Sequence, residues 1–251
     1  MRETMLAAKG WVWVGFLLTY FVSAGRADDR IEEKLSKPVL LDKSLEKETS
    51  LKEAMQLLSK RHELNIVING LEYKKQLKIF NIEQFPVSLQ QMHGMPVRLQ
   101  EKPVIHLGLI IELLAKQVDG TYEIKRDHIE IVPLQQGKRN PAPPLKMSKE
   151  ETEQLDKKMQ KLVSPGKGIT PLQDVVEFLS DSSDIIIIVD SSEFKRAAKV
   201  ENVTDLPITL PPQKRVPVKE ILEQVAKQVK GRYKTKGGVA LIVPEESQDN
   251  H

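Results

Sequence analysis

Residues 115–122 read Ala-Lys-Gln-Val-Asp-Gly-Thr-Tyr, and residues 226–233 read Ala-Lys-Gln-Val-Lys-Gly-Arg-Tyr. The two stretches are 111 positions apart, and at the same offset Ile131-Val132-Pro133 recurs as Ile242-Val243-Pro244. Matching blocks at one offset indicate an internal repeat, and the length of the repeat indicates the size of the structural unit. The sequence therefore predicts two tandem copies of one domain.

The match continues upstream with a change of offset. We align Pro96-Val97-Arg98-Leu99 with Pro207-Ile208-Thr209-Leu210. Farther upstream the offset becomes 121, so the first copy carries ten additional residues, which we place within residues 84–95. Two copies of about 100 residues each have the size of ordinary domains. The expected organisation is a signal peptide (1–27), a first domain (28–134), a proline-rich linker (135–147), a second domain (148–245) and a disordered tail (246–251).

Both copies predict the same secondary structure. Ser50-Leu51-Lys52-Glu53 is a capping box, and Thr170-Pro171-Leu172-Gln173 is its counterpart with proline at the first helical position. Each opens an amphipathic helix that leads into a strand, and residues 185–189, apolar throughout, predict a strand buried on both faces. A second helix is expected at residues 105–118 and 218–229, ending near Gly120 and Gly231, and a hairpin at residues 122–132 and 232–243. The predicted fold class is α+β, with two tandem copies of a small βαβ/βαββ domain whose two helices pack on small sheets.

The run Ser50-Leu51-Lys52-Glu53-Ala54-Met55-Gln56-Leu57-Leu58, followed by Leu64-Asn65-Ile66-Val67-Ile68-Asn69, resembles the short N-terminal (STN-like) domain of secretins and TonB-dependent receptors. Residues 170–179 with residues 185–190 resemble it as well. Tandem exported copies of this kind are similar to uncharacterised exported proteins of planctomycete-type bacteria. The resemblance implies docking to protein partners in the cell envelope. Because no pore or receptor barrel follows the second copy, we do not expect the chain to form a channel.

The amino-terminal segment has the pattern of an export signal. Arg2 and Lys9 precede an apolar run over residues 11–22, and small residues follow at Val22-Ser23-Ala24 and Gly25-Arg26-Ala27. A bilayer-spanning helix needs about 20 apolar residues, so a cleaved signal is favoured over an uncleaved anchor. We therefore expect a periplasmic or secreted protein with no membrane contact in its mature form.

The amino-acid composition excludes several kinds of functional site. The chain has no cysteine, which excludes disulfides, thiolate zinc sites and cysteine nucleophiles. Its 38 basic and 35 acidic residues give a net charge of +3, of which the export signal contributes most. The remaining charge and the few aromatic residues provide little affinity for nucleic acid. The five histidines lack metal-ligand spacing, and Gly166-Lys167-Gly168 lacks the spacing of a phosphate-binding loop.

Several polar residues are nevertheless candidates. Asp190 follows an apolar strand, as catalytic and metal-binding carboxylates do, but its counterpart is Asn69, so we interpret it as a strand-end turn. We expect His106 to be a core histidine rather than a catalytic one. Tyr122 and Tyr233 are expected to cover the edge of the core with hydrated hydroxyl groups. We assign no catalytic, cofactor-binding or metal-binding residue.

The predicted function is a non-enzymatic, exported protein-binding or scaffolding role in the bacterial cell envelope. The alternatives are an accessory periplasmic subunit of a secretion or TonB-type uptake machine and, with less support, an extracytoplasmic hydrolase. The candidate partner surface is the insertion at residues 84–95, where Phe85, Met92 and Met95 are apolar residues in an expected surface loop. An equally supported alternative is that this insertion covers its own core. The envelope partner and the oligomeric state are not specified.

Overall fold

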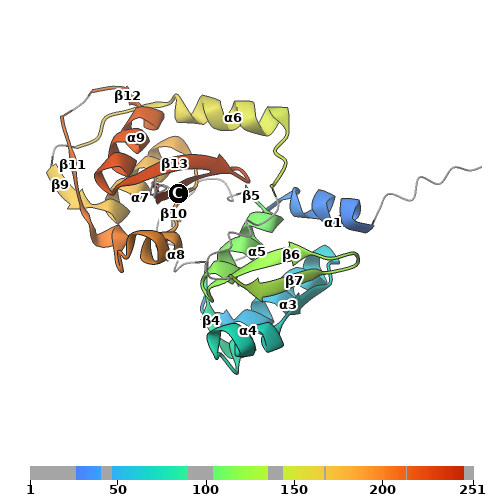
Figure 1. Ribbon diagram of the computed structural model, residues 1–251. Coiled ribbons are helices and arrows are strands. Elements are labelled where there is room, and N and C mark those ends of the chain that lie inside the picture. Colours follow the sequence, from blue (N-terminus) through green and yellow to red (C-terminus); the bar gives the residue numbers. More distant parts are fainter. Residues whose placement is uncertain are drawn as a thin grey trace, which may run out of the picture.

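The computed structural model describes residues 27–40, 47–89, 104–134, 144–166, 168–212 and 214–245. We refer to residues 27–134 as the first half and to residues 144–245 as the second half. The chain has a mixed α+β fold, as the sequence predicts (Figure 1). In the described part of the chain no helix is both long enough and apolar enough to cross a membrane.

The helices and strands follow in similar order in the two halves. The first half contains α1 (Ala27–Leu35), β1 (Pro38–Leu40), β2 (Thr49–Ser50), α3 (Leu51–His62), β3 (Ile66–Ile68), α4 (Gly70–Leu77), η1 (Ile82–Gln84), β4 (Pro86–Val87), β5 (Val104–His106), α5 (Leu107–Lys116), β6 (Gly120–Ile124) and β7 (Ile129–Pro133). The second contains α6 (Lys149–Met159), β8 (Leu162–Val163), β9 (Gly168–Pro171), α7 (Leu172–Ser183), β10 (Ile187–Val189), α8 (Ser191–Glu193), η2 (Phe194–Ala198), η3 (Val203–Asp205), β11 (Pro207–Leu210), β12 (Val216–Pro217), α9 (Val218–Gln228), β13 (Gly231–Lys236) and β14 (Val239–Pro244).

Each half has one three-stranded sheet. The strand order is β3-β7-β6 in the first half and β10-β14-β13 in the second, with one parallel pair and one antiparallel hairpin in each. The predicted turn at Gly237-Gly238 is confirmed, because both glycines have positive φ (57° and 84°), as a tight hairpin turn requires. Two-stranded pairs flank each sheet: β1 with β5 and β2 with β4, then β8 with β12 and β9 with β11.

Local signals explain where the helices begin. The Ser50 capping box is confirmed, since the Ser50 hydroxyl accepts a hydrogen bond from the Glu53 N–H while the Glu53 carboxylate accepts one from the Ser50 N–H. The expected Thr170 cap is wrong. Thr170 belongs to β9, and α7 begins at Leu172 after Pro171, because strand pairing with β11 continues up to the helix.

Strand β4 corrects the expected alignment of residues 96–99 with residues 207–210. Leu51 N–H donates to Phe85 O at 2.9 Å, and Leu172 N–H donates to Leu206 O at the same distance. The Gln117 side chain forms two hydrogen bonds with the backbone of Ser88, as Gln228 does with Thr209. Residues 85–89 therefore occupy the place of residues 206–210. The additional residues of the first half begin after Leu89, and residues 96–99 lie outside the described residues.

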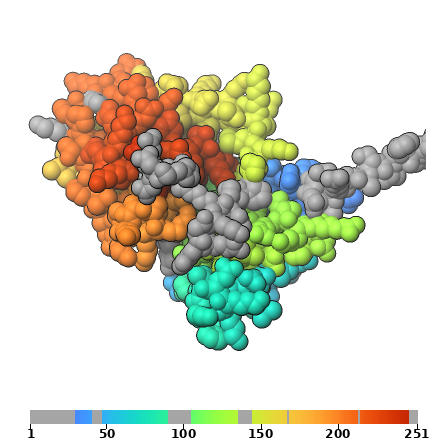
Figure 2. All heavy atoms as spheres, in the orientation of Figure 1, coloured from blue at the N-terminus to red at the C-terminus, as the bar shows by residue number. Residues whose placement is uncertain are grey.

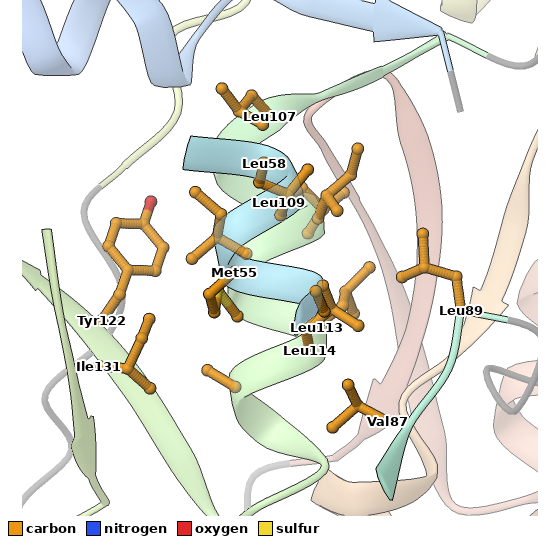
Figure 3. Close-up of a cluster of buried hydrophobic side chains, with 14 of the residues drawn as sticks. Met55, Leu58, Val87, Leu89, Leu107, Leu109, Leu113, Leu114, Tyr122 and Ile131 are labelled. Atoms are coloured by element: carbon orange, nitrogen blue, oxygen red, sulfur yellow. The ribbon is translucent and has the colours of Figure 1, made fainter. Parts of the chain in front are cut away.

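The main core includes side chains from both halves. In the first half, α3 contributes Met55 and Leu58, and α5 contributes Leu109 and Leu113 (Figure 3). The same cluster contains five side chains of the second sheet and its approach: Ile186, Ile188, Val239, Leu241 and Val243. The opposite face of that sheet faces a second cluster through Ile187, Val189, Ala240 and Ile242. The prediction that residues 185–189 are buried on both faces is confirmed.

Helix α5 is the element that joins the two halves. Every residue from Leu107 to Ala115 is buried, whereas α9, at the corresponding place in the second half, buries one face only. Figure 1 shows α5 between the β6–β7 hairpin and the second half. Because α5 is buried on every side, it acts as a shared layer between two sheets.

Candidate functional site

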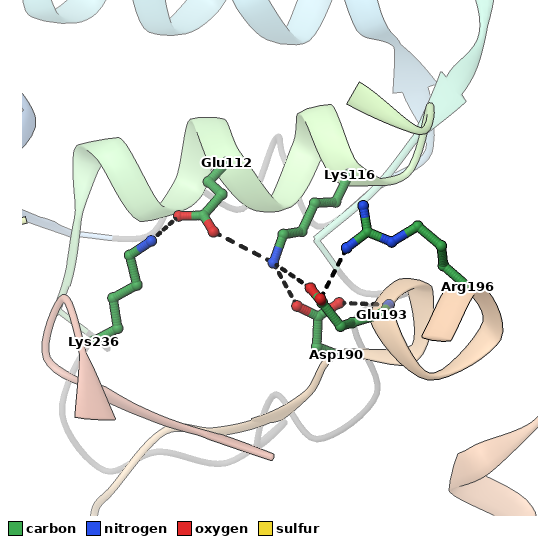
Figure 4. Close-up of polar contacts among 6 residues, drawn as sticks. All are labelled: Glu112, Lys116, Asp190, Glu193, Arg196 and Lys236. Atoms are coloured by element: carbon green, nitrogen blue, oxygen red, sulfur yellow. Dashed lines mark hydrogen bonds and ion pairs between the residues drawn. The ribbon is translucent and has the colours of Figure 1, made fainter. Parts of the chain in front are cut away.

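Most of the buried charge lies where α5 meets the second half. The Lys116 ammonium group is 2.6 Å from an Asp190 carboxylate oxygen, 3.3 Å from Glu112 and 3.5 Å from Glu193. Glu112 also pairs with Lys236, and Glu193 pairs with Arg196 at 2.8 Å (Figure 4). We call Glu112, Lys116, Asp190, Glu193, Arg196 and Lys236 the junction cluster.

Local structure positions each member of the cluster. Glu112 and Lys116 are one turn apart on α5, so their side chains lie on the same face. Asp190 directly follows β10 and caps α8, because its carboxylate accepts a hydrogen bond from the Glu193 N–H at 3.0 Å. Lys236 is the last residue of β13. Ion pairs thus connect α5 with two parts of the second half, the turn between β10 and α8 and the end of β13.

The electrostatics favour the charged form of Lys116. Burial alone lowers the pKa of Lys116, but the carboxylates of Asp190 and Glu112 outweigh it and raise that pKa above its usual value. Burial, together with the nearby Lys116 and Lys236 ammonium groups, lowers the pKa of Lys234. The carboxylates of Asp190, Glu112 and Glu193 are all paired with cations. The cluster is suited to holding two elements together.

The space beside the cluster is small. A cavity of about 40 Å³ is lined by residues that include Lys116, Asp190 and Ser191. No group of three or more potential metal ligands lies among the residues that the structure describes.

Asp190 takes the turn-forming role that the sequence predicts. Asn69 caps α4 in the same way, accepting a hydrogen bond from the Glu72 N–H at 3.0 Å. The ion pair between Asp190 and Lys116 was not expected, because these residues are 74 positions apart. One signal pointed to it: Glu112 is the sole acidic residue in the apolar helix Leu-Gly-Leu-Ile-Ile-Glu-Leu-Leu-Ala-Lys.

A second polar contact also crosses between the halves. His106 is buried, as predicted, and its Nε2 lies 3.1 Å from Glu151 Oε1 at the start of α6. The backbone N–H of His106 donates a hydrogen bond to the backbone oxygen of Gly237 at 3.1 Å. An open pocket of about 130 Å³ adjoins the pair. Burial raises the pKa of Glu151, but hydrogen bonds from Ser148 and His106 outweigh it and lower that pKa overall.

The tyrosine prediction is wrong for Tyr122. Its side chain is fully buried and its hydroxyl group has no hydrogen-bond partner among the described residues. Burial raises the pKa of Tyr122 well above its usual value. The equivalent Tyr233 is only partly buried.

The predicted partner surface is only partly described. Phe85 is exposed, but its carbonyl group accepts the hydrogen bond from Leu51 at the start of α3, so its backbone is part of the fold. Met92 and Met95 lie outside the described residues. The partner role of Phe85, Met92 and Met95 stays a prediction.

The sequence did not lead us to predict the exposure of two other apolar residues. Leu71, on α4, and Phe80, which follows it, are 71% and 69% exposed. Comparison at the offset of 121 could have found them, because Ser192 and Glu201 occupy the equivalent positions.

Comparison with protein-family models, with curated proteins and with solved structures finds no match to this chain.

Proposed function

We propose that the protein is an exported, non-enzymatic protein-binding or scaffolding component of the cell envelope. In this proposal two copies of one α+β unit are joined into a single block by α5 and the junction cluster, and an open sheet of the first half binds a partner. Export rests on the basic, apolar and small-residue order of residues 1–27.

The observation that carries this proposal is the difference between strands β3 and β10. Val67, in β3, is 41% exposed, whereas the equivalent Ile188, in β10, is buried against the first half. All three residues of β10 are buried, while those of β3 are exposed or partly exposed. The second sheet has its covering layer. On the same face of the first sheet Thr121 is buried and Glu130 and Val132 are half-buried, but Val67 on the outer strand is exposed.

An outer strand of this kind is suited to binding an extended peptide. Strand β3 pairs with β7 on one side only within the described residues, so its other edge retains backbone donors and acceptors. A partner strand that adds to such an edge gains main-chain hydrogen bonds. The strand is short, which limits uncontrolled pairing between copies.

The junction cluster supports a structural role for the buried charged groups. Its carboxylates are already paired with Lys116, Lys236 and Arg196. A catalytic carboxylate needs access to a substrate as well as a suitable pKa. These groups instead stabilise the contact between the halves.

Site-specific photo-cross-linking in the native cell tests the proposal. A photoreactive amino acid at Val67 is expected to form a discrete adduct with an envelope protein. The matched control is the same amino acid at Glu220, an exposed residue of α9 on the second half. Identical adduct patterns at the two positions, or no adduct at Val67, would contradict binding at the β3 edge.

A further inference from the structure

Leu71 and Phe80 lie on either side of Lys74 in the segment after β3. The Lys74 ammonium nitrogen is 5.2 Å from the centre of the Phe80 ring, a cation–π distance. Leu71 precedes Lys74 by three residues on α4, so the two side chains are neighbours on one helix face. Figure 2 shows this part of the chain, in teal, as a lobe that projects at the lower end of the molecule. We call Leu71, Lys74 and Phe80 the α4 surface.

The second half shows that the fold does not need these apolar residues. Ser192, Lys195 and Glu201 occupy the equivalent positions, and Lys195 pairs with Glu201 at 2.9 Å. Neighbouring features are shared: Lys78 and Lys199 both have left-handed backbone, and Glu72 pairs with Lys75 as Glu193 pairs with Arg196. The first half therefore replaces a serine and an ion-paired glutamate with exposed leucine and phenylalanine. Both changes replace a polar side chain with a large exposed apolar one in a single short segment, which makes this segment a candidate interaction site.

Charge indicates what the α4 surface binds. Lys74, Lys75 and Lys78 are all exposed on this segment, whereas Glu72 is its one carboxylate. In the second half Glu201 supplies a negative charge at the position of Phe80. The first half has thus gained apolar area and lost a negative charge at the same place. A partner with carboxylates around an apolar side chain complements both changes.

We propose that the α4 surface binds an acidic peptide segment of a protein partner, with an apolar side chain of that segment between Leu71 and Phe80 and its carboxylates near the lysines. This inference rests on the proposed binding function and specifies its partner. The surface begins directly after β3, since Asn69 alone separates Ile68 from Gly70. A strand added at the β3 edge would continue onto it.

The geometry favours a peptide over a lipid surface. Helix α4 has eight residues, and Leu71 is its one large exposed apolar residue. Helices that bind membranes carry a longer apolar face. The carboxylates of Glu72 and Glu83, each paired with a lysine, also border the segment and would oppose an anionic membrane.

A peptide selection tests the inference. The mature chain is used to select from a displayed library of random short peptides, and the selected peptides are synthesised and titrated. The test variant is Leu71→Ser/Phe80→Glu, which copies the residues of the second half and should therefore fold. The control is Ile169→Thr, because Ile169 is 72% exposed on β9, far along the chain. Circular dichroism melting verifies that both variants fold. Vesicles of phosphatidylglycerol and phosphatidylcholine form a separate arm.

We expect peptides that combine acidic residues with leucine or an aromatic residue. The affinity of these peptides should fall roughly tenfold or more in Leu71→Ser/Phe80→Glu, because large side chains at the centre of an interface supply much of its binding energy. Their affinity for Ile169→Thr should equal that for the wild type. Selection that yields no peptide able to distinguish the wild type from the double variant overturns the inference. Vesicle binding that the double variant loses, without selected peptides, overturns it in favour of a lipid surface.

Cross-linking at Val67 in the double variant separates this inference from the proposed function. Adducts that persist unchanged refute the α4 surface and leave the binding function in place. Absence of adducts in the wild type refutes the binding function itself.

Discussion

Replacing Lys116 with methionine tests whether the junction cluster holds the two halves together. Lys116→Met keeps most of the aliphatic packing of the side chain and removes its charge. Asp190 would then retain the Glu193 N–H as a hydrogen-bond donor but lose its ion pair. Glu112 would keep Lys236, and Glu193 would keep Arg196. The principal cost is therefore an unpaired carboxylate at Asp190.

The structure sets the size of the effect. The Asp190 side chain is 3% exposed and that of Lys116 is 15% exposed. Breaking a buried ion pair by removing one partner costs about 3–5 kcal/mol, and the partial exposure of Lys116 favours the lower end, about 3 kcal/mol. Asp190→Asn should cost about 1–2 kcal/mol, because Lys116 keeps Glu112 and Glu193 and an asparagine can cap α8 as Asn69 caps α4.

The decisive variant is Lys116→Met/Asp190→Asn. It contains neither the buried ammonium nor the buried carboxylate, so we expect it to be more stable than Lys116→Met alone, with a coupling energy of about 2–3 kcal/mol. Urea unfolding of the mature chain, followed by far-ultraviolet circular dichroism, measures the free energy of unfolding. A Lys116→Met variant within about 0.5 kcal/mol of the wild type, or additive single costs, would refute a closed junction.

The pH dependence provides a second measurement on the same variants. Since the pKa of Lys116 is raised above its unfolded value near 10.5, its contribution to stability is complete below that pH and declines as the pH rises through the folded pKa. As the pH rises above 10.5, the free energy of unfolding should therefore fall more in the wild type than in Lys116→Met. Equal losses in the two proteins would contradict a charged, buried Lys116.

The remaining predictions concern the core and the separation of the halves. Tyr122→Phe removes a buried hydroxyl without a partner in the described structure, so stability should be unchanged or rise by up to about 1 kcal/mol in thermal melts, whereas Tyr73→Phe loses a hydrogen bond to Val132 O and should be slightly destabilised. Because burial raises the pKa of both tyrosines, each variant should also lose less stability than the wild type above pH 10. Gly231→Ala should cost about 1–3 kcal/mol in urea unfolding, because its Cβ would lie 2.7 Å from Val243 O and 2.9 Å from Phe194 Cζ; Gly166→Ala, with nothing within 4 Å, is the control. Residues 144–245 expressed alone expose the apolar face that includes Ile188 and Leu241, so they should bind a hydrophobic dye and self-associate in size-exclusion chromatography; a monomer without dye binding would contradict the shared core.

Features with a local cause could be predicted from the sequence. The Ser50 cap, the hairpin turn at Gly237-Gly238 and the capping role of Asp190 depend on residues within a few positions. The strand at residues 185–189 could be predicted as doubly buried because apolar side chains that alternate between two faces need a layer on each. The identity of that second layer was not predictable, since it is α5 of the other half.

The α+β class and the similar order of elements in the two halves were thus determined by the sequence alone, through spacing of apolar residues, caps and glycines. Tertiary structure decided the rest. It placed residues 85–89 beside α3, buried α5 on every side, and brought Lys116 to Asp190 across 74 positions. It also left Val67, Leu71 and Phe80 uncovered in the first half, where equivalent positions in the second are buried or polar. The physical reason is that burial and ion pairing depend on which surfaces meet, and two similar sequences acquire different surroundings when one half supplies the helix that covers the other.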